Sequence, residues 1–270
     1  MNNKKILQEI SLKYGSDKIE HGYINTYESY FSEIKDKKLK ILEIGIADGK
    51  SLLTWSDYFK NSIIVGLDIH KIDVIEKKLD RENIKIHQGS QSDEIFINKI
   101  IKQYNSFDII IDDGSHLSKD VKKSFHLLFP HLNNDGIYVV EDMQTSYNHF
   151  FGGNPFDLKY SNSHMNFFKN LTDSLNYQEV ANPFYIKKKY DSKVTNISFY
   201  HNLVFVKKGI NDVMSREVLN HSYEKMKFKE KSIRTGKNFR YYLKYMLFYQ
   251  AYTYLLFILN LIKKITLFRF

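Results

Sequence analysis

Short runs of apolar residues alternate with longer amphipathic stretches between about residues 39 and 209. The runs are rich in β-branched residues, which is typical of strands that are covered on both faces. We predict five such strands, in chain order Leu39–Gly45, Ser62–Asp68, Ile84–Gln88, Phe107–Asp113 and Gly136–Asp142. A later apolar run, Ile197–Val206, predicts one long strand or two strands joined as a hairpin.

Segments of helical length lie between these strands. A helix over Ser51–Phe59 or His116–Leu128 would bring several apolar side chains of that segment near one another. The alternation predicts βαβ units, and therefore an α/β fold with a doubly wound, mostly parallel, Rossmann-like sheet. We expect a helical cap over residues 1–38, the α/β domain over 39–209, and a basic and hydrophobic helical tail over 210–270.

Composition predicts a folded protein with a sizeable core, because 43% of the 270 residues are hydrophobic and only three are prolines. The lack of cysteine excludes disulfides, thiolate metal ligands and a cysteine nucleophile. Residues 1–14 lack the continuous apolar segment of a secretory signal. We therefore expect a cytoplasmic protein.

Much of the net charge of +9 lies near the C-terminus, where residues 225–244 hold eight basic residues and a single acid, Glu230. The α/β domain is nearer to charge balance, so we expect no nucleic-acid partner. The next segment, residues 245–262, has no charged residue but four tyrosines. Eighteen helical residues span about 27 Å, slightly less than a hydrocarbon core of about 30 Å.

A helix of this kind, flanked by lysines and arginines, suits an anionic membrane surface better than a full span. We therefore expect residues 240–270 to hold the protein peripherally at the inner membrane face. The alternative is a helix that is buried in the protein or forms a homo-oligomer, and the sequence does not separate the two.

Two glycines and two acids form a candidate cofactor site. Gly45 and Gly49 follow the first strand and open a helix, so the backbone there can approach a ligand. Glu43 precedes them, and Asp68 ends the second strand, where a carboxylate can accept hydrogen bonds from ribose hydroxyls. The alternative is a tight strand-to-helix turn with a helix-capping aspartate.

The glycine spacing excludes two ligand types. A phosphate-binding loop of the G-x-x-x-x-G-K-[ST] kind needs four residues between its glycines, and here there are three. A dinucleotide fingerprint needs glycine where this chain has Ala47. Asp48 within the loop also suits a cationic ligand better than a pyrophosphate. The pattern instead resembles the first motif of class I methyltransferases, which bind S-adenosylmethionine.

Acidic side chains also follow the fourth and fifth strands. The fourth ends in Asp112-Asp113-Gly114-Ser115-His116, and the fifth ends in Glu141-Asp142. Because the carboxyl ends of parallel strands share one edge of the sheet, we expect these side chains to lie close together. Carboxylates in one space repel each other unless a proton or a cation intervenes, and oxygen ligands favour Mg²⁺, Mn²⁺ or Ca²⁺. The alternative is that these residues are only strand-end caps and turn formers.

Several stretches together resemble the metal-dependent sugar O-methyltransferases that modify macrolide antibiotics such as mycinamicin and tylosin. The resemblance covers about residues 14–209. It rests on Gly15-Ser-Asp-Lys18 with His21-Gly-Tyr23, Leu42-Glu-Ile-Gly45, Ile86-His-Gln-Gly89 with Gln91-Ser-Asp93, Phe107 to His116, Gly136 to Asp142 with Thr145-Ser-Tyr147, and Ser198 to Gly209. Two departures are Ser90, where the family often has an acid, and Ala47-Asp48, where smaller residues are common.

The resemblance implies roles for particular residues. His116 would be the general base, and Asp113, Glu141 and Asp142 would hold Mg²⁺ or Mn²⁺. The contacts of S-adenosylmethionine would be Glu43, Gly45, Gly49, Asp68, Gln91 and Asp112, and those of the acceptor would include Thr145 and Tyr147. Aromatic residues in the segment 145–153 could stack on a sugar ring or simply pack in the protein.

The expected function is therefore methylation of a sugar hydroxyl, in a glycan, as in polysaccharide biosynthesis, or in a glycolipid or glycosylated natural product. Three alternatives stay open. One is a catechol-type methyltransferase that acts on another small-molecule hydroxyl. The second is a nucleic-acid methyltransferase, which the local placement of the charge disfavours. The third is a non-catalytic scaffold that keeps the fold.

Overall fold

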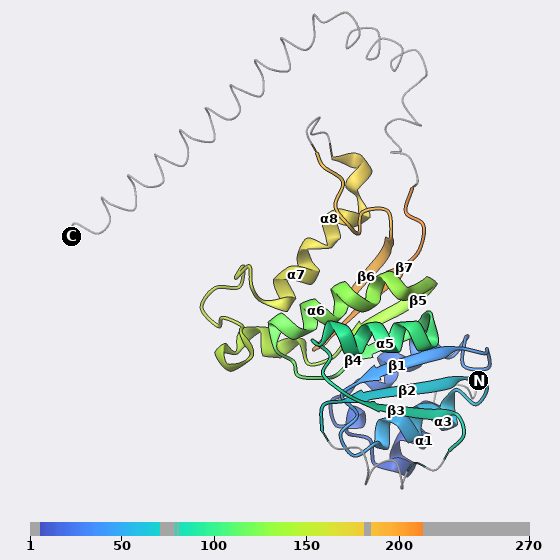
Figure 1. Cartoon of the computed structure of the whole chain (residues 1–270). Coiled ribbons are helices and arrows are strands. Elements are labelled where there is room, and N and C mark those ends of the chain that lie inside the picture. The colour runs from blue at the N-terminus through green and yellow to red at the C-terminus, as the bar shows by residue number, and fades with distance from the viewer. Residues whose placement is uncertain (1–5, 71–78, 80, 181–184, 213–270) are drawn as a thin grey trace, which may run out of the picture. The chain divides into compact units, whose positions relative to one another are not determined.

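The computed structural model describes residues 6–70, 79, 81–180 and 185–212 (Figure 1). The predicted tail over 210–270, with its membrane helix, lies almost entirely outside the described residues. No helix in the described part of the chain has the length and apolar character needed to cross a membrane.

The centre of the fold is a seven-stranded sheet with the order β3-β2-β1-β4-β5-β7-β6. Five strands are parallel, whereas β7 runs antiparallel to β5 and to β6. The strands are β1 (Lys40–Ile44), β2 (Ile63–Asp68), β3 (Ile84–Gln88), β4 (Phe107–Asp112), β5 (Leu132–Val140), β6 (Val194–Tyr200) and β7 (Leu203–Lys208). The predicted doubly wound, mostly parallel α/β sheet is confirmed.

Helices and short 3-10 turns connect the strands. The helices are α1 (Ile6–Tyr14), α2 (Ile24–Phe31), α3 (Lys50–Tyr58), α5 (Glu94–Tyr104), α6 (Ser118–Leu128), α7 (His164–Asn170) and α8 (Thr172–Leu175). The 3-10 turns are η2 (Asp17–Ile19), η3 (Phe129–His131), η4 (Met143–Tyr147), η5 (His149–Phe151) and η6 (Tyr177–Glu179).

The run 197–206 is a hairpin, which is one of the two arrangements predicted, and Asn202 at its turn has a positive φ of 59°. Two details differ from the sequence-based expectation. Helix α6 begins at Ser118 rather than His116, since His116 itself has a positive φ of 55°, which a right-handed helix does not allow. Strand β5 begins at Leu132, four residues before the predicted start.

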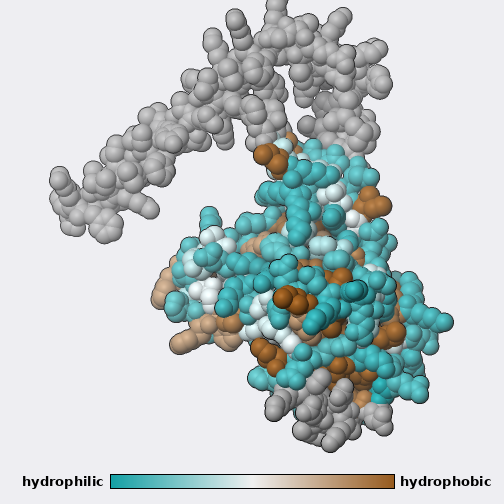
Figure 2. Space-filling view, in the orientation of Figure 1, coloured by the Kyte–Doolittle hydropathy of each residue, from teal (hydrophilic) through white to brown (hydrophobic). Residues whose placement is uncertain are grey.

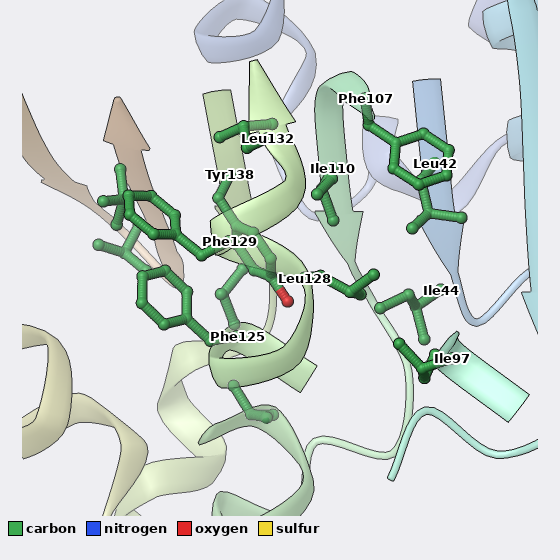
Figure 3. Close-up of a cluster of buried hydrophobic side chains, with 14 of the residues drawn as sticks. Leu42, Ile44, Ile97, Phe107, Ile110, Phe125, Leu128, Phe129, Leu132 and Tyr138 are labelled. Atoms are coloured by element: carbon green, nitrogen blue, oxygen red, sulfur yellow. The ribbon is translucent and has the colours of Figure 1, made fainter. Parts of the chain in front are cut away.

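Two apolar layers cover the sheet, because successive strand residues point to opposite faces. On one face, Leu42 and Ile44 of β1 belong to a cluster with α5 and α6, part of which Figure 3 shows. On the other face, Ile41 packs in a cluster with Leu7 of α1 and Trp55 of α3. Each large apolar side chain buried in this way contributes about 1.5–3 kcal/mol to the stability of the fold. The residues before β1 thus share the core of the sheet.

The strand order places a ligand-binding crevice between β1 and β4. From β1 the chain continues outward to β2 and β3, then returns to β4 on the other side and continues to β5. The connections that leave β1 and β4 therefore diverge, and the carboxyl ends of these two strands leave space between them. The predicted cofactor and metal residues lie at this edge.

Candidate active site

A cavity of about 470 Å³ lies at the carboxyl edge of the parallel strands. Residues that follow β1, β2, β3 and β4 line it, together with Asp17 and His21 from the N-terminal segment. Of the residues predicted from sequence, six line the cavity: Gly45, Asp68, Gln91, Asp113, His116 and Asp142. The other six do not: Glu43, Gly49, Asp112, Glu141, Thr145 and Tyr147.

Gly45 must be glycine for two independent reasons. Its φ of 80° is in the left-handed region, which residues with a Cβ rarely adopt. A Cβ at this position would also lie 2.1 Å from the carbonyl oxygen of Asp113. The ends of β1 and β4 can therefore approach each other only because this side chain is absent, and the cavity begins at that point.

Asp68 holds the loop that follows β1. Its Oδ2 accepts hydrogen bonds from the backbone N–H groups of Ile46 (3.0 Å) and Ala47 (3.2 Å), and its Oδ1 accepts one from His70 (2.8 Å). The residue is 8% exposed and lines the cavity. The carboxylate thus shapes the loop in addition to facing the space where a ligand would bind.

Glu43 lies behind the cavity wall and is fully buried. Its carboxylate accepts hydrogen bonds from Ser51 Oγ (2.7 Å) and Trp55 Nε1 (3.1 Å), both on α3. Burial raises the pKa of Glu43, and the charge of Lys18, 3.4 Å away, opposes this rise. Gly49, with a φ of 82°, directly precedes α3. The two hydrogen bonds to Glu43 hold the start of α3 against β1.

Asp112 and Gln91 form a buried pair that supports the loop after β4. Gln91 Nε2 donates to Asp112 Oδ1 (3.0 Å), and Gln91 Oε1 accepts from the backbone N–H of Ser115 (2.7 Å). Ser124 and Tyr138 also donate to Asp112. Burial raises the pKa of Asp112 to about 6, although these hydrogen bonds oppose the rise. The pair fixes the position of the loop that carries Asp113 and His116.

Asp113, His116 and Asp142 converge in the cavity. Each offers one ligand atom, and the three atoms lie within 4.8 Å of one another. His116 Nε2 is 3.7 Å from Asp142 Oδ2. His116 and Asp142 both have positive φ values, 55° and 53°, which are uncommon for residues with a side chain. These two backbone conformations direct both side chains into one space.

Asp142 is also held from the N-terminal segment. Tyr23 OH donates a hydrogen bond of 2.7 Å to Asp142 Oδ1. Partial burial raises the pKa of Asp142, but the Tyr23 hydrogen bond and the neighbouring His116 outweigh it, so the net pKa is below its usual range. This carboxylate therefore carries its negative charge at neutral pH.

Glu141 points away from the cavity into a second group of acids. Its Oε1 accepts from Lys18 Nζ (2.6 Å) and from Tyr27 OH (2.5 Å). Lys18 Nζ also contacts Asp113 Oδ2 (2.8 Å). Burial raises the pKa of Glu141 to about 8, with a further contribution from Asp113, whereas Lys18 opposes the rise. The three predicted metal ligands thus form two adjoining groups that share Asp113.

The loop after β5 lies beside His116. Thr145 Oγ1 donates to the carbonyl oxygen of Asp142 (2.7 Å), so its hydroxyl supports the loop. The ring of Phe151 lies 6.4 Å from that of His116. Tyr147, Phe150 and Phe156 are exposed, the last two by 88% and 97%. Figure 2 shows apolar side chains of this loop at the surface.

Comparison with known proteins identifies the family. Residues 42–143 match a family described as a methyltransferase domain. The mycinamicin VI 2''-O-methyltransferase of Micromonospora griseorubida is 34% identical over 225 residues, which cover 78% of this chain and 54% of that protein. The demethylmacrocin O-methyltransferase of Streptomyces fradiae is 34% identical over 218 residues, 77% of this chain and 54% of that protein.

A solved structure agrees with these matches. The MycE methyltransferase from the mycinamycin biosynthetic pathway, in complex with Mg and SAH, superposes with a TM-score of 0.72 at 35% identity. The match covers 77% of this chain and 55% of that one. This chain therefore contains a methyltransferase domain, and its sheet has the class I methyltransferase fold. It spans about half the length of the relatives named here.

Side chains that line the cavity fit the two ligands of that solved structure. The carboxylates of Asp113 and Asp142 offer ligand atoms within 4.8 Å of each other, and carboxylate oxygens suit a divalent cation such as Mg²⁺. Gly45 and Ala47 line the same cavity, and Gly45 has no side chain that would obstruct a ligand there. Ile69, next to Asp68, also lines the cavity and is 63% exposed. An apolar wall next to a carboxylate suits an adenosine.

Sequence reasoning missed the part of the methyltransferase site that comes from the N-terminal segment. Lys18, Tyr23 and Tyr27 all donate hydrogen bonds to the acids after β4 and β5. Asp17 and His21 line the cavity. Four of these residues fall in the Gly15-to-Tyr23 stretch that carries the family resemblance, which was the available signal. The hydrogen bonds of Lys18 join residues that are 95 and 123 positions apart, and contacts between such distant positions produce no periodic pattern in the sequence.

Proposed function

We propose that this methyltransferase transfers a methyl group from S-adenosylmethionine to a sugar hydroxyl of a glycosylated natural product, with Mg²⁺ or Mn²⁺ bound. The observation that carries the proposal is the convergence of Asp113, His116 and Asp142 in the cavity that the loop after β1 also lines. A methyl donor beside β1 and an acceptor beside β4 and β5 would then meet within one space.

The methyl donor would lie along the ends of β1, β2 and β3. Gly45 and Asp68 border that part of the cavity, and Gln91 borders it from the loop after β3. Glu43, Gly49 and Asp112 would act indirectly, because they hold these loops from behind. We therefore expect changes at these three residues to weaken binding through the shape of the site.

The metal would be held by Asp113 and Asp142, with Glu141 completing the set through a change of side-chain direction toward the cavity. The chemistry supplied by a bound divalent cation is the orientation of the sugar hydroxyls and a lower pKa for the reacting one. The low pKa of Asp142 supports this assignment, because a metal ligand must be deprotonated.

His116 would act as the general base. The acceptor oxygen attacks the sulfonium methyl carbon while the carbon–sulfur bond breaks. The electron pair of that bond stays on sulfur, and the leaving group is neutral S-adenosylhomocysteine. The hydroxyl proton passes to a ring nitrogen of His116. The carboxylate of Asp142 near Nε2 would stabilise the imidazolium that forms.

The acceptor would bind over the loop after β5. Its exposed aromatic residues include Tyr147 and Phe150, and the ring of Phe151 lies 6.4 Å from that of His116. Aromatic faces pack well on the C–H faces of a sugar and on an apolar aglycone. The relatives are named for methylation of sugars on such compounds, among them 8-demethyl-8-alpha-L-rhamnosyl tetracenomycin-C. Thr145 would contribute by fixing this loop on Asp142.

A transfer assay tests this proposal. The full chain would be incubated with methyl-labelled S-adenosylmethionine, Mg²⁺ and a panel of glycosylated macrolides, other glycosides, glycolipids, sugar nucleotides and catechols. We expect label in the glycosides, with none after removal of the sugar. Label in catechols alone would favour the catechol-type alternative. Failure to bind S-adenosylmethionine in calorimetry would favour the non-catalytic scaffold.

A further inference from the structure

Lys18 is the only buried lysine in the described part of the chain, and it is 1% exposed. It lies in the short turn η2, between α1 and α2. An ammonium group withdrawn from water is unfavourable unless anions surround it closely. The proposed catalytic steps assign Lys18 no role, so its burial needs another reason.

Three carboxylates surround this ammonium group. Its Nζ lies 2.6 Å from Glu141 Oε1, 2.8 Å from Asp113 Oδ2 and 3.4 Å from Glu43 Oε1. These acids come from the ends of β1, β4 and β5, and their ligand atoms form one of the two groups that could hold a cation. Lys18 thus occupies the centre of the buried group.

Asp113 connects this group to the cavity. It belongs both to the buried group around Lys18 and to the group formed with His116 and Asp142. Lys18 contacts Oδ2 of Asp113, which fixes the direction of that carboxylate. A charge on the buried side therefore acts directly on a carboxylate of the proposed metal site.

We propose that Lys18 is a resident counter-ion that keeps the Glu43, Asp113 and Glu141 carboxylates together before the divalent cation binds. It is a positioning residue, since it acts through Asp113 and Glu141 rather than on the substrate. This inference rests on the proposed function for the divalent cation, whereas its effect on the metal-free protein does not depend on that cation.

Electrostatics determines the direction of the effect. Without Lys18, these three carboxylates, two of them fully buried, would have no cation among them, and they would repel one another or take up protons at a cost in stability. The metal-free protein would then lose stability, and a divalent cation would relieve more repulsion than it does in the unchanged protein. If Lys18 contributed only packing, its replacement would not change the rise in stability that Mg²⁺ causes.

The test is thermal unfolding of the full chain at constant pH, with EDTA or with MgCl₂, for the unchanged protein and for Lys18→Met. In EDTA we expect the Tm of Lys18→Met to fall by about 5–10 °C, as for loss of one partner of a buried ion pair. We expect the rise in Tm on adding MgCl₂ to be larger in Lys18→Met than in the unchanged protein.

Two further variants keep the test decisive. Lys18→Met with Glu43→Gln removes one positive and one negative charge, so it should regain part of the lost Tm and respond less to MgCl₂ than Lys18→Met does. It also replaces Lys18→Met if that variant fails to fold, since folding of the double variant alone would then show the recovery. Lys13→Met removes a lysine whose side chain is 61% exposed, and it should alter neither value.

The outcomes separate the two proposals. If the unchanged protein shows no response to MgCl₂, the proposed divalent cation is wrong, and the lower Tm of Lys18→Met in EDTA would still support the counter-ion. If the unchanged protein responds but Lys18→Met keeps its Tm in EDTA, or gains no more from MgCl₂, the counter-ion proposal is wrong. A double variant no more stable in EDTA than Lys18→Met would also overturn it.

Discussion

At the scale of single residues, the site depends on backbone conformations that are uncommon for their residue types. His116 and Asp142 have left-handed φ values, and Gly45 has one that glycine tolerates without strain. Each of these residues directly follows a parallel strand or lies within a few residues of one. The end of a strand is where the chain must turn sharply, so the turns that link the elements also aim the side chains.

The proposed base gives the first prediction. We expect His116→Ala to lower kcat by about 10²–10⁴-fold, the usual effect of losing a general base, with S-adenosylmethionine binding retained. Methyl-transfer kinetics and calorimetry would measure the two quantities. His201→Ala, which changes an exposed histidine in the β6–β7 turn, is the matched control and should leave kcat unchanged. An unchanged kcat in His116→Ala would mean that this histidine only packs.

The close approach of β1 and β4 gives a prediction on stability. Gly45→Ala places a Cβ 2.1 Å from a carbonyl oxygen at a φ of 80°, so we expect a loss of roughly 2–4 kcal/mol in the free energy of unfolding. Gly15→Ala is the control, since Gly15 has a similar φ of 66° but nothing within 4 Å of the added Cβ. Equal losses in urea unfolding would show that φ, rather than the approach of the strands, determines the effect.

At the scale of elements, hydrophobic periodicity predicted the sheet well because its parallel strands are buried on both faces. It also placed Asp113, His116 and Asp142 together, since all follow strands that end at the same edge. It could not predict the direction of the Glu141 side chain. Glu141 faces Lys18, whereas its neighbour in sequence, Asp142, faces the cavity. Side-chain direction after a strand depends on the local φ, which apolar patterns do not encode.

Helices α6 and α7 meet at a buried histidine, which gives a prediction on pH. His164 Nδ1 is hydrogen-bonded to Ser118 Oγ at 3.0 Å, and its Nε2 has no partner among the described residues. Burial lowers the pKa of His164 to about 4, with smaller contributions from His116 and Lys122. The folded protein thus binds this proton less readily than the unfolded chain, whose histidine pKa is about 6.5.

The contribution of His164 to stability is therefore complete above about pH 6.5 and falls as the pH decreases toward 4. Within that window we expect a slope of up to about 1.4 kcal/mol per pH unit from this residue. Urea unfolding between pH 7 and pH 4.5 would compare the unchanged protein with His164→Gln, which carries no titratable group there. Parallel stability curves for the two proteins would contradict the prediction.

At the scale of the whole molecule, the structure describes one unit, which ends at Asp212 and holds the seven-stranded sheet with its cavity. The matched regions cover 54% of the length of each of the two relatives named above. The eight basic residues within 225–244 lie outside the described residues.

Residues 240–270 give a prediction on membrane association. Because residues 245–262 lack charge and basic residues flank them, we expect the full chain to sediment with anionic liposomes. A chain shortened to end at Gly236 should stay folded and bind S-adenosylmethionine but remain in the supernatant. Neutral liposomes are the control. A full chain that ignores anionic liposomes, or a shortened chain that aggregates, would favour a buried or oligomer-forming helix.

Dependence on a divalent cation is the central claim, and removal and return of the metal tests it most directly. Transfer of labelled methyl to a glycoside acceptor would be measured before chelation, after exhaustive EDTA treatment, and after adding Mg²⁺ back. We expect transfer to disappear with EDTA and to return with Mg²⁺, and Glu141→Gln to impair transfer more than S-adenosylmethionine binding. Full transfer after exhaustive chelation would contradict the metal-assisted mechanism.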